Sequence, residues 1–479
     1  MIIMRRTKII CTLGPAVDNE KKLERLIKAG FDVARFNFSH GSYEEHGERM
    51  DLLKRVSRNQ NKDIAILLDT KGPEIRTGEV DGKIFLKKGN LIILTTKIIK
   101  GSTEKISITY KDLPKEVKPQ DRILLDDGLI ELEVVSINKN EISCIIKNSG
   151  ELGSRKGVNL PHVHIKLPGI SEKDREDILF GLEKNIHFLA LSFVREKKDI
   201  EEARKILGEA GKHVQIIAKI EAAVALKNLD DILEASDGVM IARGDLGVEI
   251  PAMEVPIVQK MIIQKARLVG KPVIVATQML DSMMRNPRPT RAEVSDVANS
   301  ILDGTDAIML SGETAGGRYP IEALKMMNDI AKETEKDLHL LEPMHFKGLK
   351  KSPKLVDMVA YSTVDIGKKI GAKALVVPTH GGSTARRIAR YRPNIPILAL
   401  IEKPEIKYSL KLVWGVESLL ISSSYKSTDD LIHEGELTLL KQKGYKLKDK
   451  VVFTAGIPLK VPGTTNMIRV LELGEGGEL

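Results

Sequence analysis

Several apolar runs of this sequence end in charged, amide or hydroxyl side chains whose spacing could bring them together. In the run ARFNFSHG, Arg35, Asn37 and Ser39 alternate with Phe36 and Phe38. Alternate residues of an extended chain face opposite sides, so the three polar side chains share one side and the phenylalanines the other. The phenylalanines can pack in a core, which leaves the polar side chains pointing together at a common target.

The same kind of ending follows other apolar runs. The polar residues at the ends of six runs are Arg35, Asn37 and Ser39; Asp69 and Thr70, followed by Lys71 and Arg76; Lys219 and Glu221; Arg243, Gly244 and Asp245; Thr277 and Gln278; and Ser311 and Glu313. One charged residue at a strand end is usually a solvated edge. Parallel strands in a barrel, however, bring their carboxyl ends to one rim, where these side chains would form a single site.

Glu221 and Asp245 are candidates for holding a divalent cation. Mg²⁺ is commonly bound by one or two carboxylates, while water and substrate phosphate supply the other ligands. Lys219 lies two residues before Glu221 on the same strand face and could stabilise negative charge developing beside the metal. Gly244 lets backbone N–H groups approach an anion closely. The alternative is a pair of structural salt bridges, from Glu221 to Lys219 and from Asp245 to Arg243.

A second set of oxygen donors comprises Asn37, Ser39, Asp69 and Thr70. These side chains carry one full negative charge among them. That charge is low for a divalent ion and better suited to a monovalent cation. The alternative for this set is a plain hydrogen-bonded network of buried polar groups.

The elements that would position these residues are eight strand-like runs separated by amphipathic helical segments. The runs cover 8–14, 32–38, 64–70, 187–193, 214–220, 238–244, 272–278 and 307–313. Continuous apolar runs are typical of parallel strands that are buried on both faces. Eight strand–helix units in series predict a (β/α)₈ TIM barrel, and residues 1–70 with 166–342 provide roughly the 250 residues that this fold needs. An open, doubly wound sheet is the competing architecture.

Helix-capping signals support the intervening helices. The segment NEKKLERLIKAG ends at Gly30, which suits the residue after a helix. Ser171 is followed by Asp174, and Thr290 by Glu293, at the spacing of a capping box.

Two further regions have a different pattern. Residues 71–165 contain short alternating strands with Gly, Asp and Asn turns, which predict a small all-β barrel domain inserted after the third strand, where it would cover the barrel mouth as a lid. Residues 343–479 predict a separate C-terminal α/β domain. The catalytic barrel would then comprise residues 1–70 and 166–342.

Composition narrows the class of protein. The chain has 479 residues, 42% of them hydrophobic, a net charge of +9, only 4% aromatic residues and two cysteines. Scattered lysines and few aromatic residues argue against a nucleic-acid-binding surface. We see no signal peptide, membrane-spanning run or disulfide framework, so we expect a cytoplasmic protein with no nucleic acid or membrane partner.

At these residues the sequence resembles the pyruvate kinases almost from end to end. The matching blocks, in order, are CTLGP (11–15), ARFNFSHG (34–41), LDTKGPEIRTG (68–78), KGVNLP (156–161), SEKD (171–174), ARGDLG (242–247), ATQMLDSM (276–283), PTRAEVSDVANSILDGTDAIMLSGETAGGRYP (289–320) and AGIPLKVPGTTN (455–466). The resemblance implies the final step of glycolysis, in which the phosphoryl group of phosphoenolpyruvate passes to ADP to form pyruvate and ATP.

The resemblance also implies roles for individual residues. The catalytic residues would be Lys219, Arg35 and Thr277. Phosphoenolpyruvate would contact Arg35, Gly244, Asp245 and Thr277, and the nucleotide would lie near Arg35, Asn37, His40, Arg76 and Lys156. Mg²⁺ or Mn²⁺ would bind Glu221 and Asp245, and K⁺ would bind Asn37, Ser39, Asp69 and Thr70. Family members with glutamate at the position of Glu74 need K⁺, so we expect K⁺ dependence. They are usually homotetramers, and many bind a phosphorylated effector in the C-terminal domain.

The chain departs from the family pattern at several positions, among them Ala218, where serine is common, and His162, where glycine is common. After Glu221 the family usually has Asn, a polar residue and Gly, whereas this chain has Ala222, Ala223 and Val224. Gly381 in the C-terminal turn 379–384 stands where serine is common, so the effector could differ or be absent. Such changes around a site alter affinity more readily than reaction type.

Two other function classes are weighed against phosphoryl transfer. A metal-dependent aldolase or lyase acting on a pyruvate enolate would share the barrel and the paired carboxylates, but it would not need ADP or the inserted domain. A non-enzymatic basic binding protein would leave the polar strand ends unexplained.

Overall fold

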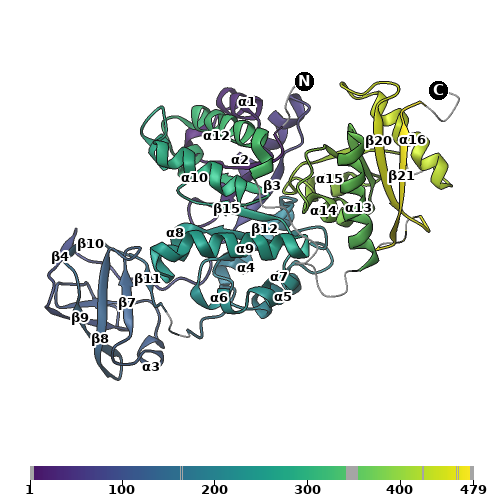
Figure 1. Ribbon diagram of the computed structural model, residues 1–479. Coiled ribbons are helices and arrows are strands. Elements are labelled where there is room, and N and C mark those ends of the chain that lie inside the picture. Colours follow the sequence, from purple (N-terminus) through teal and green to yellow (C-terminus); the bar gives the residue numbers. More distant parts are fainter. Residues whose placement is uncertain are drawn as a thin grey trace.

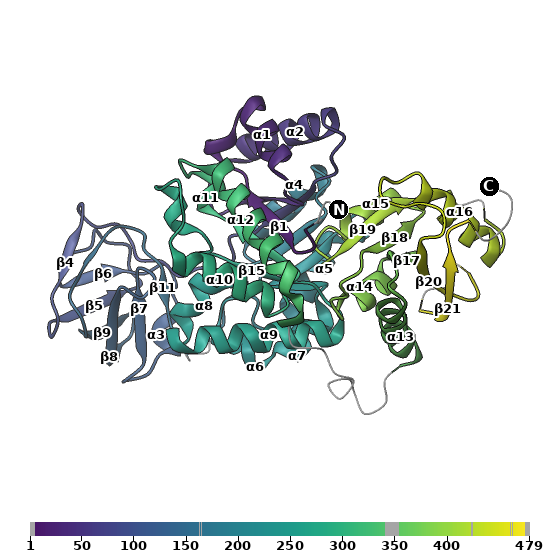
Figure 2. The ribbon, with the colours of Figure 1, turned by 45° about the horizontal axis from the view of Figure 1, so that its top comes forward.

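Three folded units lie side by side in the computed structural model, which describes residues 5–161, 163, 165–340, 354–422, 425–459, 461 and 463–474. A central barrel separates a small β domain from a C-terminal α/β domain (Figures 1 and 2). Among the described residues, no helix is both long and apolar enough to cross a membrane.

The central unit is a closed barrel of eight parallel strands, in the order β1-β16-β15-β14-β13-β12-β3-β2. Each predicted apolar run forms one strand, and barrel closure excludes the open doubly wound sheet. The strands are β1 (Lys8–Thr12), β2 (Val33–Asn37), β3 (Ala65–Asp69), β12 (Phe188–Leu191), β13 (Gln215–Ile220), β14 (Gly238–Ala242), β15 (Val273–Ala276) and β16 (Ala307–Leu310).

Helices surround the barrel and begin at the predicted caps. Capping boxes at Ser171 and Thr290 start α4 and α10, and Gly30 ends α1 in the left-handed conformation with a φ of 92°. The helices of this unit are α1 (Glu20–Ala29), α2 (Tyr43–Asn59), α4 (Glu172–Glu183), α5 (Lys197–Leu207), α6 (Ala223–Lys227), α7 (Leu229–Ala235), α8 (Arg243–Glu249), α9 (Val255–Val269), α10 (Arg291–Leu302), α11 (Gly312–Ala315) and α12 (Pro320–Thr334).

The barrel strands are apolar on both faces because each face contacts a different core. Ile9 and Cys11 pack outward in the core beneath the helices, whereas Ile10, between them, packs in the barrel interior. The interior core is completed by Leu412, which comes from the C-terminal domain and is fully buried. Beside it, Tyr408 stacks on the ring of His187 with the ring centroids 4.0 Å apart. The C-terminal domain therefore contributes side chains to the floor of the barrel.

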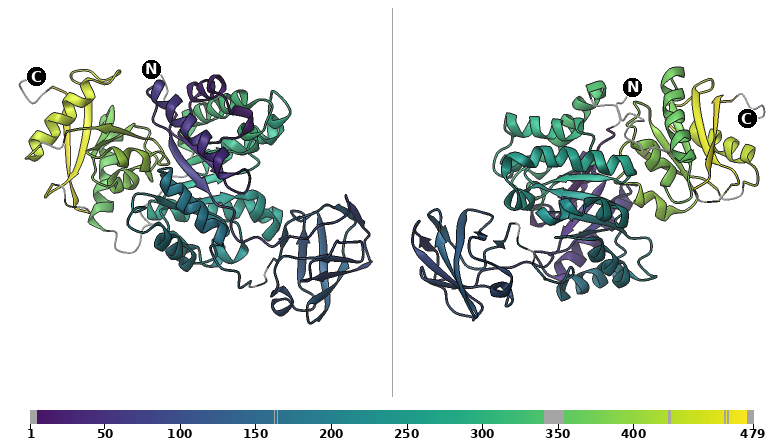
Figure 3. Two further views of the ribbon diagram at one scale, coloured as in Figure 1. Left: turned by 180° about the vertical axis from the view of Figure 1, so that it is seen from behind. Right: turned by 60° about the horizontal axis from the view of Figure 1, so that its bottom comes forward.

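The inserted unit follows β3 and projects from one side of the barrel (Figure 3). A six-stranded sheet in the order β11-β7-β8-β9-β5-β6 and a two-stranded ribbon, β10-β4, make up its β structure. The sheet forms a half-barrel. Arg76 and Thr77 lie between its two edges and form one single bridge to each: Arg76 to Gly157, just before β11, and Thr77 to Ile108, just after β6. Its elements are β4 (Ile84–Leu86), β5 (Leu91–Thr95), β6 (Lys105–Ser107), α3 (Leu113–Glu116), β7 (Arg122–Leu125), β8 (Ile130–Asn138), β9 (Glu141–Ile146), β10 (Gly150–Leu152) and β11 (Val158–Asn159).

The C-terminal unit is a five-stranded sheet in the order β19-β18-β17-β20-β21, with β21 antiparallel to β20. The predicted boundary at 342/343 falls within residues 341–353, which lie outside the described residues. Its elements are α13 (Leu355–Ile370), β17 (Ala374–Pro378), α14 (Ser383–Ala389), β18 (Ile397–Ile401), α15 (Pro404–Ser409), β19 (Val416–Leu420), α16 (Thr428–Leu440), β20 (Lys450–Gly456) and β21 (Thr465–Glu472).

We predict that Leu412→Ala destabilises the protein because it opens a cavity in the barrel floor. Truncating a fully buried leucine costs about 2–5 kcal/mol of unfolding free energy, measured here by urea unfolding. The matched control is Leu420→Ala, since the Leu420 side chain is 59% exposed and its truncation should cost about 0.5 kcal/mol or less. Equal effects of the two substitutions would contradict this role for Leu412.

Candidate active site

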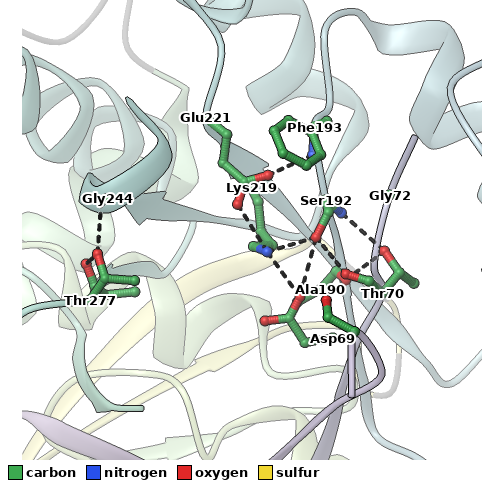
Figure 4. Close-up of polar contacts among 12 residues, drawn as sticks. Asp69, Thr70, Gly72, Ala190, Ser192, Phe193, Lys219, Glu221, Gly244 and Thr277 are labelled. Carbon is green, nitrogen blue, oxygen red and sulfur yellow. Dashed lines mark hydrogen bonds and ion pairs between the residues drawn. The ribbon is translucent and has the colours of Figure 1, made fainter. Parts of the chain in front are cut away.

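The ends of the barrel strands form a buried polar network centred on the ammonium group of Lys219 (Figure 4). Lys219 Nζ lies 3.0 Å from Asp69 Oδ1 and 2.9 Å from Glu221 Oε1, and it donates to Ser192 Oγ at 2.6 Å. Burial alone would lower the pKa of Lys219, but the two carboxylates raise it above its usual range. The ammonium group is therefore held charged and oriented by acceptors from three other residues.

Asp69 is fully buried between two cations. Its Oδ2 accepts from Arg35 Nε at 2.6 Å, opposite the contact of Oδ1 with Lys219. Burial favours the neutral form, but Lys219 and Arg35 together lower the pKa of Asp69 below its usual value. The carboxylate stays ionised and joins β2, β3 and β13 into one electrostatic unit.

Two members of this network, Thr12 and Ser192, are absent from the residues predicted from sequence. Thr12 Oγ1 accepts from Arg35 Nη1 at 2.9 Å, and Ser192 Oγ donates to Thr70 O at 2.6 Å while accepting from Lys219. Thr12 is the last residue of β1, and Ser192 directly follows β12. The hydroxyl residue at each of those ends was the available signal.

Glu221 directly follows β13, and Asp245 lies in the first turn of α8, which follows the neighbouring strand β14; the two carboxyl groups interact, as the divalent-cation hypothesis requires. Burial, with the nearby Glu221 carboxylate, raises the pKa of Asp245 to about 7, although Lys219 lowers it in part. Glu221 Oε2 also accepts from Phe193 N at 2.7 Å, which fixes its orientation. The buried carboxylate of Glu221 and the partly buried carboxylate of Asp245 carry charge that Lys219 offsets only in part, and such a pair fits a hard divalent cation.

The alternative of two structural salt bridges is half realised. Glu221 does pair with Lys219, but the guanidinium of Arg243 pairs with Asp296 Oδ1 at 2.7 Å rather than with Asp245. Arg243 also donates to the carbonyl oxygen of Thr277 at 2.8 Å. Asp245 therefore has no ion-pair partner within 4.0 Å among the described residues.

Thr277 follows β15 in a strained conformation. Its φ is 69° and that of Gln278 is 55°, values that are rare for side-chain-bearing residues and especially for a β-branched one. The hydroxyl oxygen of Thr277 accepts from Gly244 N at 2.9 Å and donates to Ala276 O at 2.6 Å. Strain held by specific contacts of this kind is common at functional sites.

The four residues predicted for a monovalent cation end neighbouring strands β2 and β3. Asn37 pairs with Asp69 in the strand register, and Asn37 Oδ1 accepts from Ser39 N at 3.2 Å. Asp69 and Thr70 are almost fully buried, and both contact Ser192. The described contacts thus realise the hydrogen-bonded network that the sequence analysis offered as the alternative.

The nucleotide candidates divide between two units. Arg35 and Asn37 lie on β2, and His40 is exposed just beyond it. Arg76 and Lys156 belong to the inserted domain and line a cavity of about 700 Å³ between that domain and the barrel. Asp245 lines the same cavity, together with Ala222, Ala223 and Val224 of the departing segment. The cavity thus connects the inserted domain to the carboxylate end of the site.

In the C-terminal domain, the turn 379–384 borders a second cavity of about 320 Å³. Gly382 N donates to Thr379 Oγ1 at 3.0 Å, and Thr384 Oγ1 lies 2.9 Å from Thr465 Oγ1. Glu402 and Tyr425 also line this cavity and are hydrogen-bonded to each other.

Comparisons with known proteins agree with one another. Family models described as "Pyruvate kinase, barrel domain" and "Pyruvate kinase, alpha/beta domain" match residues 4–324 and 357–471. Pyruvate kinases of Staphylococcus aureus strains MRSA252 and USA300 are each 48% identical over 475 residues, which cover 98% of this chain and 81% of each relative. A solved pyruvate kinase from Cryptosporidium parvum has a TM-score of 0.90 and 36% identity, covering 98% of this chain and 96% of that one.

We predict a pH-dependent stability effect at Asp245 in protein free of divalent cations. Since its pKa is about 7 in the folded state, against an ordinary value of 3.8, the folded protein binds this proton more tightly and loses stability as pH rises towards 7. Asp245→Asn removes the partly buried charge, so its melting temperature should exceed that of the unsubstituted protein near pH 8, and the difference should shrink to less than half near pH 5, which lies between the two pKa values. A difference that is the same at both pH values would contradict the shifted pKa.

The same variant tests whether this site holds a cation. Adding Mg²⁺ or Mn²⁺ should raise the melting temperature of the unsubstituted protein, because a ligand that binds only the folded state stabilises it. The increase should be lost in Asp245→Asn, whereas Asp303→Asn, which removes a carboxylate at the end of α10, should keep it. Stabilisation that survives in Asp245→Asn would place the divalent cation elsewhere.

Proposed function

The chain belongs to the pyruvate kinase family, whose members transfer the phosphoryl group of phosphoenolpyruvate to ADP in glycolysis, and we propose that this transfer takes place at the strand ends around Lys219. The observation that carries the proposal is the ammonium of Lys219, held between Asp69 and Glu221 beside Asp245. A transferring phosphoryl group carries diffuse negative charge, so catalysis depends mainly on positioning and charge stabilisation. The network supplies positive groups at fixed positions.

The family generally uses a divalent and a monovalent cation. In this chain, Glu221 and Asp245 would hold Mg²⁺ or Mn²⁺, and their partly uncompensated charge supports that assignment. When bound, the divalent ion would offset charge on the phosphoryl and enolate oxygens. Asn37, Ser39, Asp69 and Thr70 would hold K⁺, the monovalent ion expected for a chain with Glu74.

The catalytic residues would be Lys219, Arg35 and Thr277. Arg35 would bind the phosphoryl group through the guanidinium face that its contacts with Asp69 and Thr12 leave available. Lys219 would stabilise the enolate as the bond to phosphorus breaks. The Thr277 hydroxyl would take part in proton delivery to the enolate carbon through water, since its own pKa is too high for it to act alone. Gly244 and Asp245 would complete the phosphoenolpyruvate site.

The nucleotide would lie between the barrel and the inserted domain. Arg35, Asn37 and His40 would contact it from the barrel, and Arg76 and Lys156 from the lid. Lys156 Nζ pairs with Asp126 at 2.9 Å and Arg76 with Glu74 at 2.7 Å, so both cations are preoriented at the cavity wall. Closure of the lid over ADP would exclude water and limit hydrolysis.

The remaining assignments concern the whole protein. Residues 1–70 with 166–342 would be the catalytic barrel, 71–165 the lid, and 343–479 the effector and oligomerisation domain. The protein would be a cytoplasmic homotetramer, as is usual in the family, and it would bind neither nucleic acid nor membranes. A phosphorylated effector would occupy the 320 Å³ cavity beside turn 379–384.

We predict that Lys219→Met lowers kcat for pyruvate formation by about two to four orders of magnitude, as expected when a charge-stabilising group is removed. The assay follows pyruvate formed from phosphoenolpyruvate, with ADP, Mg²⁺ and K⁺ present, and turnover that continues without ADP would indicate the lyase alternative. The control is Lys212→Met, because Lys212 has a side chain that is 71% exposed, in the same strand–helix unit. Full activity of a folded Lys219→Met variant would contradict the assigned role.

We also predict that combining Asn37→Ala with Ser39→Ala weakens activation by K⁺. The K⁺ concentration needed for half-maximal activity should rise about tenfold or more, because two oxygen ligands are lost. A tenfold change corresponds to about 1.4 kcal/mol of binding free energy, roughly the contribution of one hydrogen bond. Circular dichroism should show an intact fold, because Asn37 and Ser39 are only partly buried. An unchanged K⁺ response in the folded variant would leave these residues without this role.

A further inference from the structure

The loop between β2 and α2 carries two of the candidate site residues, Ser39 and His40, although much of it is open to solvent. Residues 40–42 are exposed, and so are the first three residues of α2. Gly41 has a φ of 80°, in the left-handed region that favours glycine. A loop that must hold ligands at fixed positions needs support from its inner side, because solvent gives it none.

His46, near the start of α2, supplies such support. It is 4% exposed, and its Nε2 lies 2.7 Å from the carbonyl oxygen of His40. A carbonyl oxygen can only accept, so Nε2 carries the proton and donates it to this bond. The Nδ1 atom has no hydrogen-bond partner among the described residues, in agreement with an unprotonated nitrogen. Burial lowers the pKa of His46 below its usual value, which favours this neutral form.

Two phenylalanines fix the orientation of the His46 ring. The ring stacks on Phe38 with the centroids 4.2 Å apart and 13° between the planes, and it meets Phe36 edge-on at 6.3 Å. Both phenylalanines are almost fully buried. They are the residues that alternate with Asn37 and Ser39 along the chain. The apolar side of this segment therefore holds the ring that in turn supports the polar side.

The loop and the helix approach each other closely at Gly41. A Cβ there would lie 3.2 Å from His46 Nε2 and 2.8 Å from Glu45 Oε2. Glu45 also completes the capping box of α2, since its Oε2 accepts from Ser42 N at 3.0 Å. The capping box fixes the residue after Gly41, and the bond from His46 fixes the residue before it.

Contacts with β2 hold the other side of the loop. Ser39 N donates to Asn37 Oδ1 at 3.2 Å, and His40 N donates to Asn37 O at 3.3 Å. Ser39 and His40 therefore lie between an anchor on the strand and an anchor on the helix. Removing the donor of His46 would free the carbonyl side of His40 while leaving the strand anchor in place.

We propose that His46 is a positioning residue for phosphoryl transfer, which holds the His40 carbonyl so that His40 faces the nucleotide and Ser39 faces the monovalent cation. The inference rests on the proposed function, in which these two residues contact ADP and K⁺. Loss of His46 should weaken the binding of ADP and K⁺ more than it slows the chemical step, since the contacts that hold Lys219 and Arg35 lie elsewhere.

Three substitutions separate positioning from packing. His46→Phe keeps an aromatic ring for the stack but removes the donor. His46→Gln restores a donor, because the amide nitrogen of glutamine can take the place of the imidazole Nε2. The matched control is His187→Phe, since His187 also stacks on an aromatic ring, that of Tyr408, but does so at the floor of the barrel.

In His46→Phe, the KM for ADP and the K⁺ concentration for half-maximal activity should each rise about three- to tenfold, as expected when one hydrogen bond is lost, while kcat changes by less than about twofold. Calorimetric titration with ADP and Mg²⁺ should show the same loss of affinity without turnover. Hydrogen exchange of the amides in residues 39–42 should become faster. His46→Gln should recover most of each effect, and His187→Phe should show none of them.

Unchanged ADP and K⁺ constants in a folded His46→Phe variant would overturn the proposal, and so would an equal loss in His46→Gln or in His187→Phe. Faster exchange of residues 39–42 with unchanged ADP affinity would also overturn it, because the bond would then hold the loop without positioning a ligand. If His46→Phe does not fold, His46→Leu, with a smaller side chain, carries the same test. An unsubstituted protein that forms no pyruvate from phosphoenolpyruvate and ADP would instead contradict the proposed function, so the two failures are distinguishable.

Discussion

The ammonium group of Lys219 imposes the main constraint on this structure. A lysine that is 9% exposed inside a closed barrel must be paired and hydrogen-bonded to remain charged, and Asp69, Glu221 and Ser192 meet that requirement from three strand ends. Each partner then needs its own support: Arg35 for Asp69, and the amide of Phe193 for Glu221. The polar rim is therefore one cooperative network, in which the loss of one member leaves others buried without a partner.

Barrel topology explains why these particular side chains meet. Closure places β12 between β3 and β13, so Ser192 lies between Asp69 and Lys219. It also places β1 beside β2, with Thr12 opposite Arg35 in the strand register. At the opposite end of the barrel, Leu412 of the C-terminal domain completes the interior core. The barrel and the C-terminal domain thus share a core and the ion pair between Asp306 and Arg392, so a change in how the C-terminal domain docks would alter the packing at the floor of the barrel.

Much of this arrangement could be predicted from sequence. Continuous apolar runs identified all eight barrel strands, and local capping signals at Ser171, Thr290 and Gly30 identified helix ends, because both depend on neighbouring residues alone. Lys219 and Glu221 could be placed together because they are two residues apart on one strand. The contribution of Thr12 and Ser192 could not be foreseen, since a hydroxyl group at a strand end is common and acquires its role only from the order of strands in the closed barrel. The pairing of Arg243 with Asp296, rather than with Asp245, depends on the position of α10 relative to α8, which no local pattern encodes.

The central claim is that Asp69 and Lys219 act as one unit in phosphoryl transfer, and a double-mutant cycle on kcat tests it most directly. The variants are Asp69→Asn, Lys219→Met and the combination, each measured with saturating phosphoenolpyruvate, ADP, Mg²⁺ and K⁺. If the two residues act together, the double variant should be no more than about threefold slower than the slower single variant. Losses that multiply, so that the double variant falls by the product of the two single effects, would show that Asp69 and Lys219 act independently and would contradict this account.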